Sequence, residues 1–389
     1  MADERIGRRE LLARGAAILG GLALGSRPGP LRGYGPAYRG RVPSPGTGLV
    51  PTGVPNPGGG PVPACLERAR IRWIVGWTPG GGFDTYSRLA QPFIERSLDV
   101  RIAIDNVPGA GGLVGAMAIS RARPDGRTLG ILNGSGFLWN RNPETGASSD
   151  LLSDFTVLAR VAARQQLLVA GPETVIGTVH DLVALARRRT VVAGITGPDS
   201  SNFASLAAVT DLLGVPTEFV AGYPGSREVV LGLLRGDFDI TSLDIETFGS
   251  VPDLEGVHPL LQITPERSPD PRLPAVPHLA GPGGLIAGEP ELFGDDHARA
   301  HALAEAIAAY LEFGRLFAGP GDMDPALRDC VERGILAALS EPGFADAARR
   351  AGRSIDVVPG VEIRRTIPAA REAVRPIAPV VAAAVRRIR

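Results

Sequence analysis

The chain has 389 residues, with 41 arginines, 41 acidic residues, no lysine and a formal net charge of zero. This length exceeds what one hydrophobic core usually serves, so it predicts two lobes. The neutral charge gives no basic field for nucleic acid, and the absence of lysine excludes Schiff-base chemistry and Walker-type phosphate sites.

The first 25 residues have the pattern of an export signal. Basic residues that include the pair Arg8 and Arg9 precede an apolar run over residues 15–25, which is too short to anchor a protein in a bilayer. The arginine pair resembles a twin-arginine motif. We therefore expect residues 1–25 to direct export to a periplasmic or other extracytoplasmic location, the alternative being a basic N-terminus before a buried helix. Residues 26–63 are rich in proline and glycine, which predicts a disordered spacer.

The stretch that dominates the prediction is a strand, a glycine turn and a helix. A β-branched and aromatic run over residues 71–75 stops at Pro-Gly-Gly-Gly, residues 79–82, and a helical pattern follows from Asp84. Such a turn places backbone N–H groups at the positive end of a helix, where they can hold an anion without lysine or arginine. Trp77 flanks the turn as a candidate rim contact, and Asp84 is either part of the site or simply the helix cap.

Strands and helices then alternate along the chain. Predicted strands at 100–104, 128–132, 190–195 and 217–220 indicate parallel sheets covered by helices. The glycines near residue 111 match a dinucleotide fingerprint poorly, so we interpret them as a helix-packing feature. Turns at residues 196–202 and 221–226 repeat the first strand–turn–helix unit. Paired turns at strand ends favour two α/β lobes with a ligand cleft between them.

Seven motifs in the same order resemble the receptors of tripartite tricarboxylate transporters, also called Bug-type solute receptors. They occupy residues 75–84, 106–112, 124–129, 196–201, 235–239, 316–320 and 340–344.

The resemblance implies the α/β fold of type II periplasmic binding proteins. We expect lobe 1 to contain residues 64–170 and 311–389 and lobe 2 to contain residues 171–310, with the chain crossing between the lobes twice, and residues 295–313 to form an extra helix. The implied function is an exported, monomeric receptor that is not an enzyme. It would close on a small carboxylate and pass it to membrane permease subunits.

The resemblance places the ligand among turns of both lobes. In lobe 1 the expected contacts are Trp77, Pro79, Gly80, Gly81, Gly82, Phe83, Asp84, Asn133 and Ser135. In lobe 2 they are Ser200, Ser201, Asn202, Tyr223, Gly225, Ser226 and Asp244. Trp77, Phe83 and the turn at residues 222–225 depart from the family pattern toward a more aromatic rim, which favours a less polar carboxylate than citrate. Affinity that comes from backbone dipoles is expected to depend weakly on salt.

The cysteines and two of the histidines are the remaining side chains that could form a disulfide or bind a metal. Cys65 and Cys330 either form a disulfide or remain buried thiols. His297 and His301 share one helix face but lack an obvious third ligand, so we expect no metal and no cofactor. Two other functions stay open: an enzyme that uses the same cleft, and a ligand-loaded partner of a sensor system. No motif indicates binding to nucleic acid.

Overall fold

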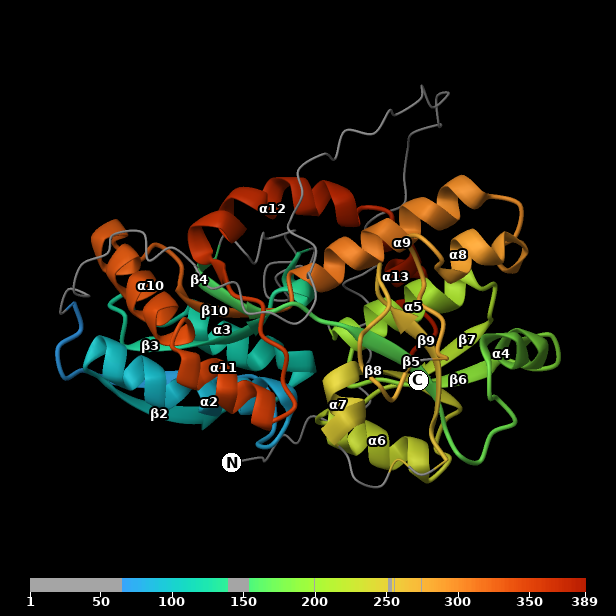
Figure 1. The fold of residues 1–389 in the computed structure, drawn as a ribbon, viewed down its shortest axis with the longest axis horizontal. Coiled ribbons are helices and arrows are strands. Elements are labelled where there is room, and N and C mark those ends of the chain that lie inside the picture. Colours follow the sequence, from blue (N-terminus) through green and yellow to red (C-terminus); the bar gives the residue numbers. More distant parts are fainter. Residues whose placement is uncertain (1–64, 139–153, 199, 251–253, 255, 274) are drawn as a thin grey trace, which may run out of the picture.

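The computed structural model describes residues 65–138, 154–198, 200–250, 254, 256–273 and 275–389. The predicted export signal and spacer lie outside these residues. Two sheets with helices packed on them form the two lobes in Figure 1. No helix among the described residues is both long and apolar enough to cross a membrane.

The first lobe is built on a six-stranded sheet. Its strand order is β11-β4-β10-β3-β1-β2. The strands are β1 (Arg70–Val75), β2 (Arg101–Asn106), β3 (Thr128–Asn133), β4 (Phe155–Ala162), β10 (Arg315–Pro320) and β11 (Val358–Pro359). β1, β2 and β3 are parallel, whereas β10 runs antiparallel to both β3 and β4. The sheet is therefore mixed rather than parallel, because a strand that returns from the second lobe completes it.

Helices cover both faces of this sheet. They are α2 (Gly82–Leu98), η1 (Ala110–Gly112), α3 (Leu113–Ser120), η2 (Ser135–Phe137), α10 (Pro325–Leu339), α11 (Pro342–Arg350) and α12 (Gly360–Val374). Gly115, inside α3, allows this helix to pack closely, as the sequence predicted: a Cβ on Gly115 would lie only 2.6 Å from the Cα of Gly76, which follows β1.

The second lobe is built on a five-stranded sheet of order β7-β6-β8-β5-β9. The strands are β5 (Gln166–Ala170), β6 (Val191–Gly194), β7 (Thr217–Val220), β8 (Ile240–Asp244) and β9 (His258–Ile263). The helices are α4 (Val179–Ala186), α5 (Ser201–Leu212), α6 (Ser226–Leu234), α7 (Ile245–Ser250), α8 (Leu285–Gly288), η3 (Pro290–Phe293), α9 (His297–Glu312) and α13 (Ile377–Val385).

The chain passes between the sheets at residues 163–165 and again at residues 313–314. β5 thus lies in the second sheet, whereas the sequence analysis placed residues up to 170 in lobe 1. A third passage follows α12, since α13 packs against α5 and the backbone of Arg387 bonds to Phe219 of β7. α9 and α12 extend along the upper side of Figure 1. The C-terminal segment therefore closes an edge of the second sheet instead of ending in lobe 1.

A disulfide joins Cys65, just before β1, to Cys330 on α10, with 6.2 Å between the Cα atoms. Of the two alternatives, the structure has the disulfide and not two reduced thiols. The bridge spans 265 residues of sequence, so the covalent loop that it closes contains every strand of both sheets except β11.

We predict that Cys330→Ser lowers the free energy of unfolding by about 2–5 kcal/mol, because the bridge restricts the unfolded chain. Urea unfolding of the oxidised protein and the variant measures the difference. Cys65→Ser and the double variant are matched controls that should lose the same amount as Cys330→Ser. Equal stability of all four proteins would show that the bridge does not contribute.

Candidate functional site

The glycine turn between β1 and α2 is braced from below by a buried carboxylate. Asp84 accepts hydrogen bonds from the Gly80 N–H at 2.9 Å, from Arg88 at 2.8 Å and from the Asn106 side chain at 3.0 Å. Asn106 also donates to the carbonyl of Trp77. Burial raises the pKa of Asp84, but these three hydrogen bonds outweigh it and hold the pKa below its usual value. Asp84 is thus an ionised support for the turn.

Because Asp84 holds the turn from one side, the first backbone N–H groups of α2 remain uncapped on the other side. Gly80 has a φ of 84°, which suits glycine, and its N–H is used by Asp84. Gly81 is the N-cap residue, and no side chain caps the helix. The N–H groups of Gly82 and Phe83 at the first turn are consequently available to an anion, in the field of the helix dipole.

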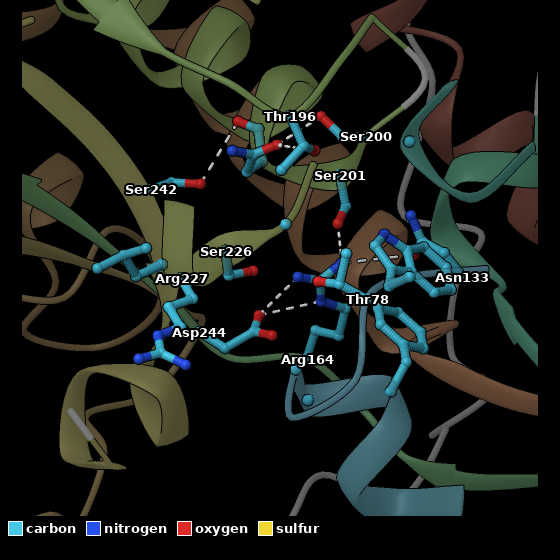
Figure 2. A pocket seen from close by; sticks show the side chains of 18 of the residues that line it. Thr78, Asn133, Arg164, Thr196, Ser200, Ser201, Ser226, Arg227, Ser242 and Asp244 are labelled. Carbon is cyan, nitrogen blue, oxygen red and sulfur yellow. Dashed lines mark hydrogen bonds and ion pairs between the residues drawn. The ribbon is translucent and has the colours of Figure 1, made fainter. Parts of the chain in front are cut away.

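Two further helices begin at the same place in the second lobe. α5 starts at Ser201 after its cap Ser200, and α6 starts at Ser226 after Gly225, which gives no side-chain cap. Residues from all three helix starts line one cavity of about 670 Å³, counting the part open to solvent. Figure 2 shows these side chains converging from both lobes. The cavity lies at the carboxyl ends of the parallel strands, where open α/β sheets bind ligands.

The two lobes approach each other closely around this cavity. A Cβ on Gly225 of lobe 2 would lie 2.9 Å from Thr78 Oγ1 of lobe 1, and one on Gly197 would lie 3.5 Å from the backbone nitrogen of Gly111. The turns predicted to face each other therefore do so. Glycine at these positions lets the facing turns meet without side chains between them.

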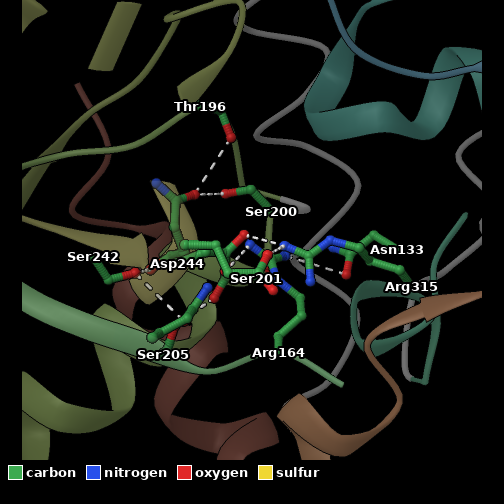
Figure 3. Close-up of polar contacts among 12 residues, drawn as sticks. Asn133, Arg164, Thr196, Ser200, Ser201, Ser205, Ser242, Asp244 and Arg315 are labelled. Atoms are coloured by element: carbon green, nitrogen blue, oxygen red, sulfur yellow. Dashed lines mark hydrogen bonds and ion pairs between the residues drawn. The ribbon is translucent and has the colours of Figure 1, made fainter. Parts of the chain in front are cut away.

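An ion cluster forms the floor of the cavity where the chain crosses between lobes. Arg164, in the first crossing segment, donates to Asp244 Oδ1 from Nε at 3.0 Å and from Nη2 at 2.8 Å. Its Nη1 contacts Ser201 Oγ and lies 3.5 Å from Asn133 Oδ1. Arg315, the first residue of β10, donates to Asp244 Oδ2 at 2.7 Å. Figure 3 shows Asp244 between the two guanidinium groups.

A second carboxylate extends this cluster away from the cavity. Glu246 of α7 accepts from the hydroxyl of Tyr86 at 2.7 Å and from the Ser354 backbone N–H at 2.8 Å. Its Oε2 lies 3.5 Å from Arg315 and 3.7 Å from Arg353. Burial and the Glu246 charge raise the pKa of Tyr86 well above its usual range, so its hydroxyl stays protonated and donates. Residues of both lobes thus share one network.

The cluster as a whole carries an excess of positive charge. Three arginines, Arg164, Arg315 and Arg353, accompany two carboxylates, so one positive charge is in excess. Burial raises the pKa of Asp244, but the charges of Arg164 and Arg315 outweigh it and hold that pKa below its usual value. Because both Asp244 oxygens already accept hydrogen bonds from guanidinium groups, an anionic ligand meets a floor that is cationic overall.

Comparison with known proteins identifies the family. The model of the tripartite tricarboxylate transporter family receptor matches residues 87–289, just over half of the chain. The chain belongs to this receptor family.

Curated relatives match the chain over part of their length. It is 26% identical over 224 residues to the UPF0065 protein in the tcbD-tcbE intergenic region of Pseudomonas sp. strain P51, covering 55% of the chain and 63% of the relative. It is 27% identical over 230 residues to BugT of Bordetella pertussis, covering 57% and 68%. The match to a UPF0065 protein of Bordetella bronchiseptica, 25% identical over 170 residues, covers 44% of the chain and only 50% of that relative. The chain therefore spans half to about two thirds of the relatives it matches.

Solved structures share the fold. An R. palustris protein with adipate has a TM-score of 0.64 at 20% identity, covering 80% of this chain and 97% of that one. Periplasmic binding protein BugD has a TM-score of 0.61 at 16% identity, covering 82% and 99%. MatC from Rhodopseudomonas palustris with bound malate has a TM-score of 0.60 at 19% identity, covering 80% and 99%. These likenesses confirm the predicted two-lobed α/β fold.

The structure brings most of the predicted site residues to the cavity. Those that line it are Trp77, Pro79, Gly81, Gly82, Phe83, Asn133, Ser200, Ser201, Asn202, Gly225, Ser226 and Asp244.

Four predicted residues lie elsewhere. Gly80 and Asp84 brace the turn from behind. Asp84 lies inside α2 and accepts from the Gly80 N–H, and no side chain caps the helix, so Asp84 neither lines the cavity nor acts as the helix cap. Ser135 is fully buried at the start of η2. Tyr223 contacts Phe238 edge-on and donates to Asp237 instead of lining the cavity.

The arginines in the cavity lining were not among the residues predicted from the sequence. Arg164 and Arg227 line the cavity together with Thr78, Gly111, Thr196, Ser242 and Leu243. Arginines thus line the cavity in which the sequence predicted an anion held by backbone N–H groups alone, and the weak dependence of affinity on salt stays a prediction. Arg164 follows an apolar strand in the sequence, and nothing local marks that position as the crossing between lobes. Among the described residues no three His, Cys, Asp or Glu side chains are placed to hold a metal.

We predict that Asp244→Asn lowers the free energy of unfolding by about 3–5 kcal/mol at pH 7, because it leaves Arg164 and Arg315 buried without their shared counter-ion. The folded-state pKa of Asp244 is lowered, so its contribution is complete above the usual value of 3.8 and is lost as pH falls through the lower folded value. Urea unfolding at pH 7 and pH 3 tests both parts.

The matched control is Asp346→Asn, which removes the half-exposed partner of Arg349. This change should cost less than about 1 kcal/mol. A similar loss of stability in both variants would contradict the role of Asp244 as the shared counter-ion of Arg164 and Arg315. So would a loss of stability in Asp244→Asn that is the same at pH 3 as at pH 7.

Proposed function

We propose that the protein is an exported solute receptor that captures a small carboxylate between its lobes without converting it. The observation that carries this proposal is the cavity on which three helix N-termini and an excess of guanidinium charge converge. Backbone N–H groups at helix starts and guanidinium groups both favour carboxylate oxygens. Membership of the receptor family and the adipate and malate of two structural neighbours support the same ligand class.

The ligand carboxylate would bind between the first turn of α2 and Arg164. There it accepts hydrogen bonds from Gly82 and Phe83 and replaces solvent beside Arg164. The rings of Trp77 and Phe83 stack at 3.7 Å and form an apolar wall next to this position. In lobe 1 the ligand would contact Trp77, Pro79, Gly81 and Gly82, while Gly80 and Asp84 support the turn. In lobe 2 the opposite wall would consist of Ser200–Asn202 and Ser226.

Ligand capture couples to lobe closure in this proposal. Arg164 lies in the first crossing segment and Arg315 directly follows the second, and Asp244 joins them. A carboxylate beside Arg164 would favour the arrangement in which the turns of both lobes meet. The closed form would be recognised by permease subunits of a tripartite tricarboxylate-type transporter, with residues 1–25 directing export. Lobe 1 would comprise the first sheet and lobe 2 the second, with β5 and α13 assigned to lobe 2.

A thermal-shift screen of the purified protein against mono-, di- and tricarboxylates, aromatic acids and acidic amino acids tests the proposal. We expect at least one carboxylate to raise the melting temperature saturably and to remain chemically unchanged. Gly81→Val should weaken binding at least tenfold, because Gly81 has a φ of −72° that accepts valine and the added side chain would enter the cavity.

The control is Gly288→Val, which adds the same side chain at an exposed glycine of α8 with open space around it. It should bind like the unaltered protein. Equal binding by both glycine variants would place the ligand outside the cavity. Consumption of the acid would favour an enzyme, and silence toward every carboxylate would refute the proposed ligand class.

A further inference from the structure

The three arginines near the cavity differ in how their charge is balanced. Arg164 and Arg315 share the carboxylate of Asp244, and their side chains are 8% and 1% exposed. Arg227 lines the cavity from the second residue of α6 and is exposed. Figure 2 draws it beside the cavity without a dashed line to any side chain shown. Within the described part of the chain, Arg227 has no ion pair.

The position of Arg227 is electrostatically unfavourable for the helix. The first turn of a helix carries the positive end of its dipole, where acidic residues are stabilising and a cation is not. α6 also lacks a side-chain cap, so its first N–H groups add to the positive field. An arginine at this position costs helix stability unless an anion lies next to it.

The neighbouring carboxylate does not serve as that anion. Glu228 turns its Oε2 toward the turn, where it would lie 3.0 Å from a Cβ on Gly225, and this oxygen is buried without a hydrogen-bond partner among the described residues. No ion pair joins Glu228 to Arg227. Arg227 thus lines the cavity with an exposed side chain whose charge is compensated by neither the helix nor its neighbour.

We infer that Arg227 is a specificity-determining residue that binds a second acidic group of the ligand. This inference rests on the proposed carboxylate site, where the first acidic group lies at the α2 start beside Arg164. Trp77, Phe83 and Leu243 line the cavity as well, so an apolar middle section suits the ligand. The ligand class is a dicarboxylate with a hydrocarbon spacer.

Calorimetric titration of the purified protein with paired acids tests this assignment. The pairs are linear dicarboxylates of about four to eight carbons, adipate among them, and the monocarboxylates of equal length, such as hexanoate for adipate. The unaltered protein should bind the best dicarboxylate at least tenfold more tightly than its monocarboxylate. Arg227→Gln should remove most of this preference by weakening the dicarboxylate about tenfold, with less than a twofold change for the monocarboxylate.

Two further variants control for charge and for general effects. Arg227→Lys keeps a positive charge and should retain part of the preference, whereas Arg188→Gln removes an exposed arginine of the same lobe outside the cavity and should change neither affinity. Equal losses for both acids in Arg227→Gln, or no loss for the dicarboxylate, would overturn the role of Arg227 alone. Failure of the unaltered protein to bind any of these acids would refute the carboxylate site itself.

Discussion

The ion pairs of Asp244 with Arg164 and Arg315 are the interaction on which the rest of the site depends. Asp244 ends a strand of the second sheet, whereas the two arginines lie where the chain crosses between the sheets. One carboxylate therefore fixes both crossings relative to lobe 2. Since two guanidinium groups face one carboxylate, the same interaction also leaves the cavity floor cationic. Architecture and electrostatics of the cavity thus have a common origin.

The glycine turn plays a complementary part. Asp84 and Asn106 fix the conformation of this turn by hydrogen bonds to the Gly80 N–H and the Trp77 carbonyl. The first N–H groups of α2 are left uncapped and do not bond to nearby carbonyls of the described residues. Preformed donors cost little reorganisation when an anion arrives. The turn supplies oriented N–H donors and the arginines supply positive charge, so an anionic group is favoured at one end of the cavity. The stacked rings of Trp77 and Phe83 favour an apolar body next to it.

Local patterns in the sequence predicted the strand–turn–helix units, and the resemblance to the receptor family predicted most of the cavity lining. The run from β1 to Asp84 encodes strand, turn and helix within a few residues, so its structure depends little on distant parts of the chain. Arg164 and Arg227 could not be found this way, because their importance comes from the crossing of the chain and the approach of α6. Tyr223 was misplaced for a similar reason: an aromatic residue beside a glycine turn faces either the cavity or the core, and Phe238 decides for the core.

The most direct test of this account is a crystal structure of the protein with the carboxylate that binds most tightly in solution. We expect one carboxylate of the ligand at hydrogen-bond distance, about 2.7–3.2 Å, from the N–H of Gly82 or Phe83 and from the guanidinium of Arg164. Both lobes should contact the ligand. A ligand bound outside the cavity, or one whose apolar end meets the start of α2, would contradict the central claim.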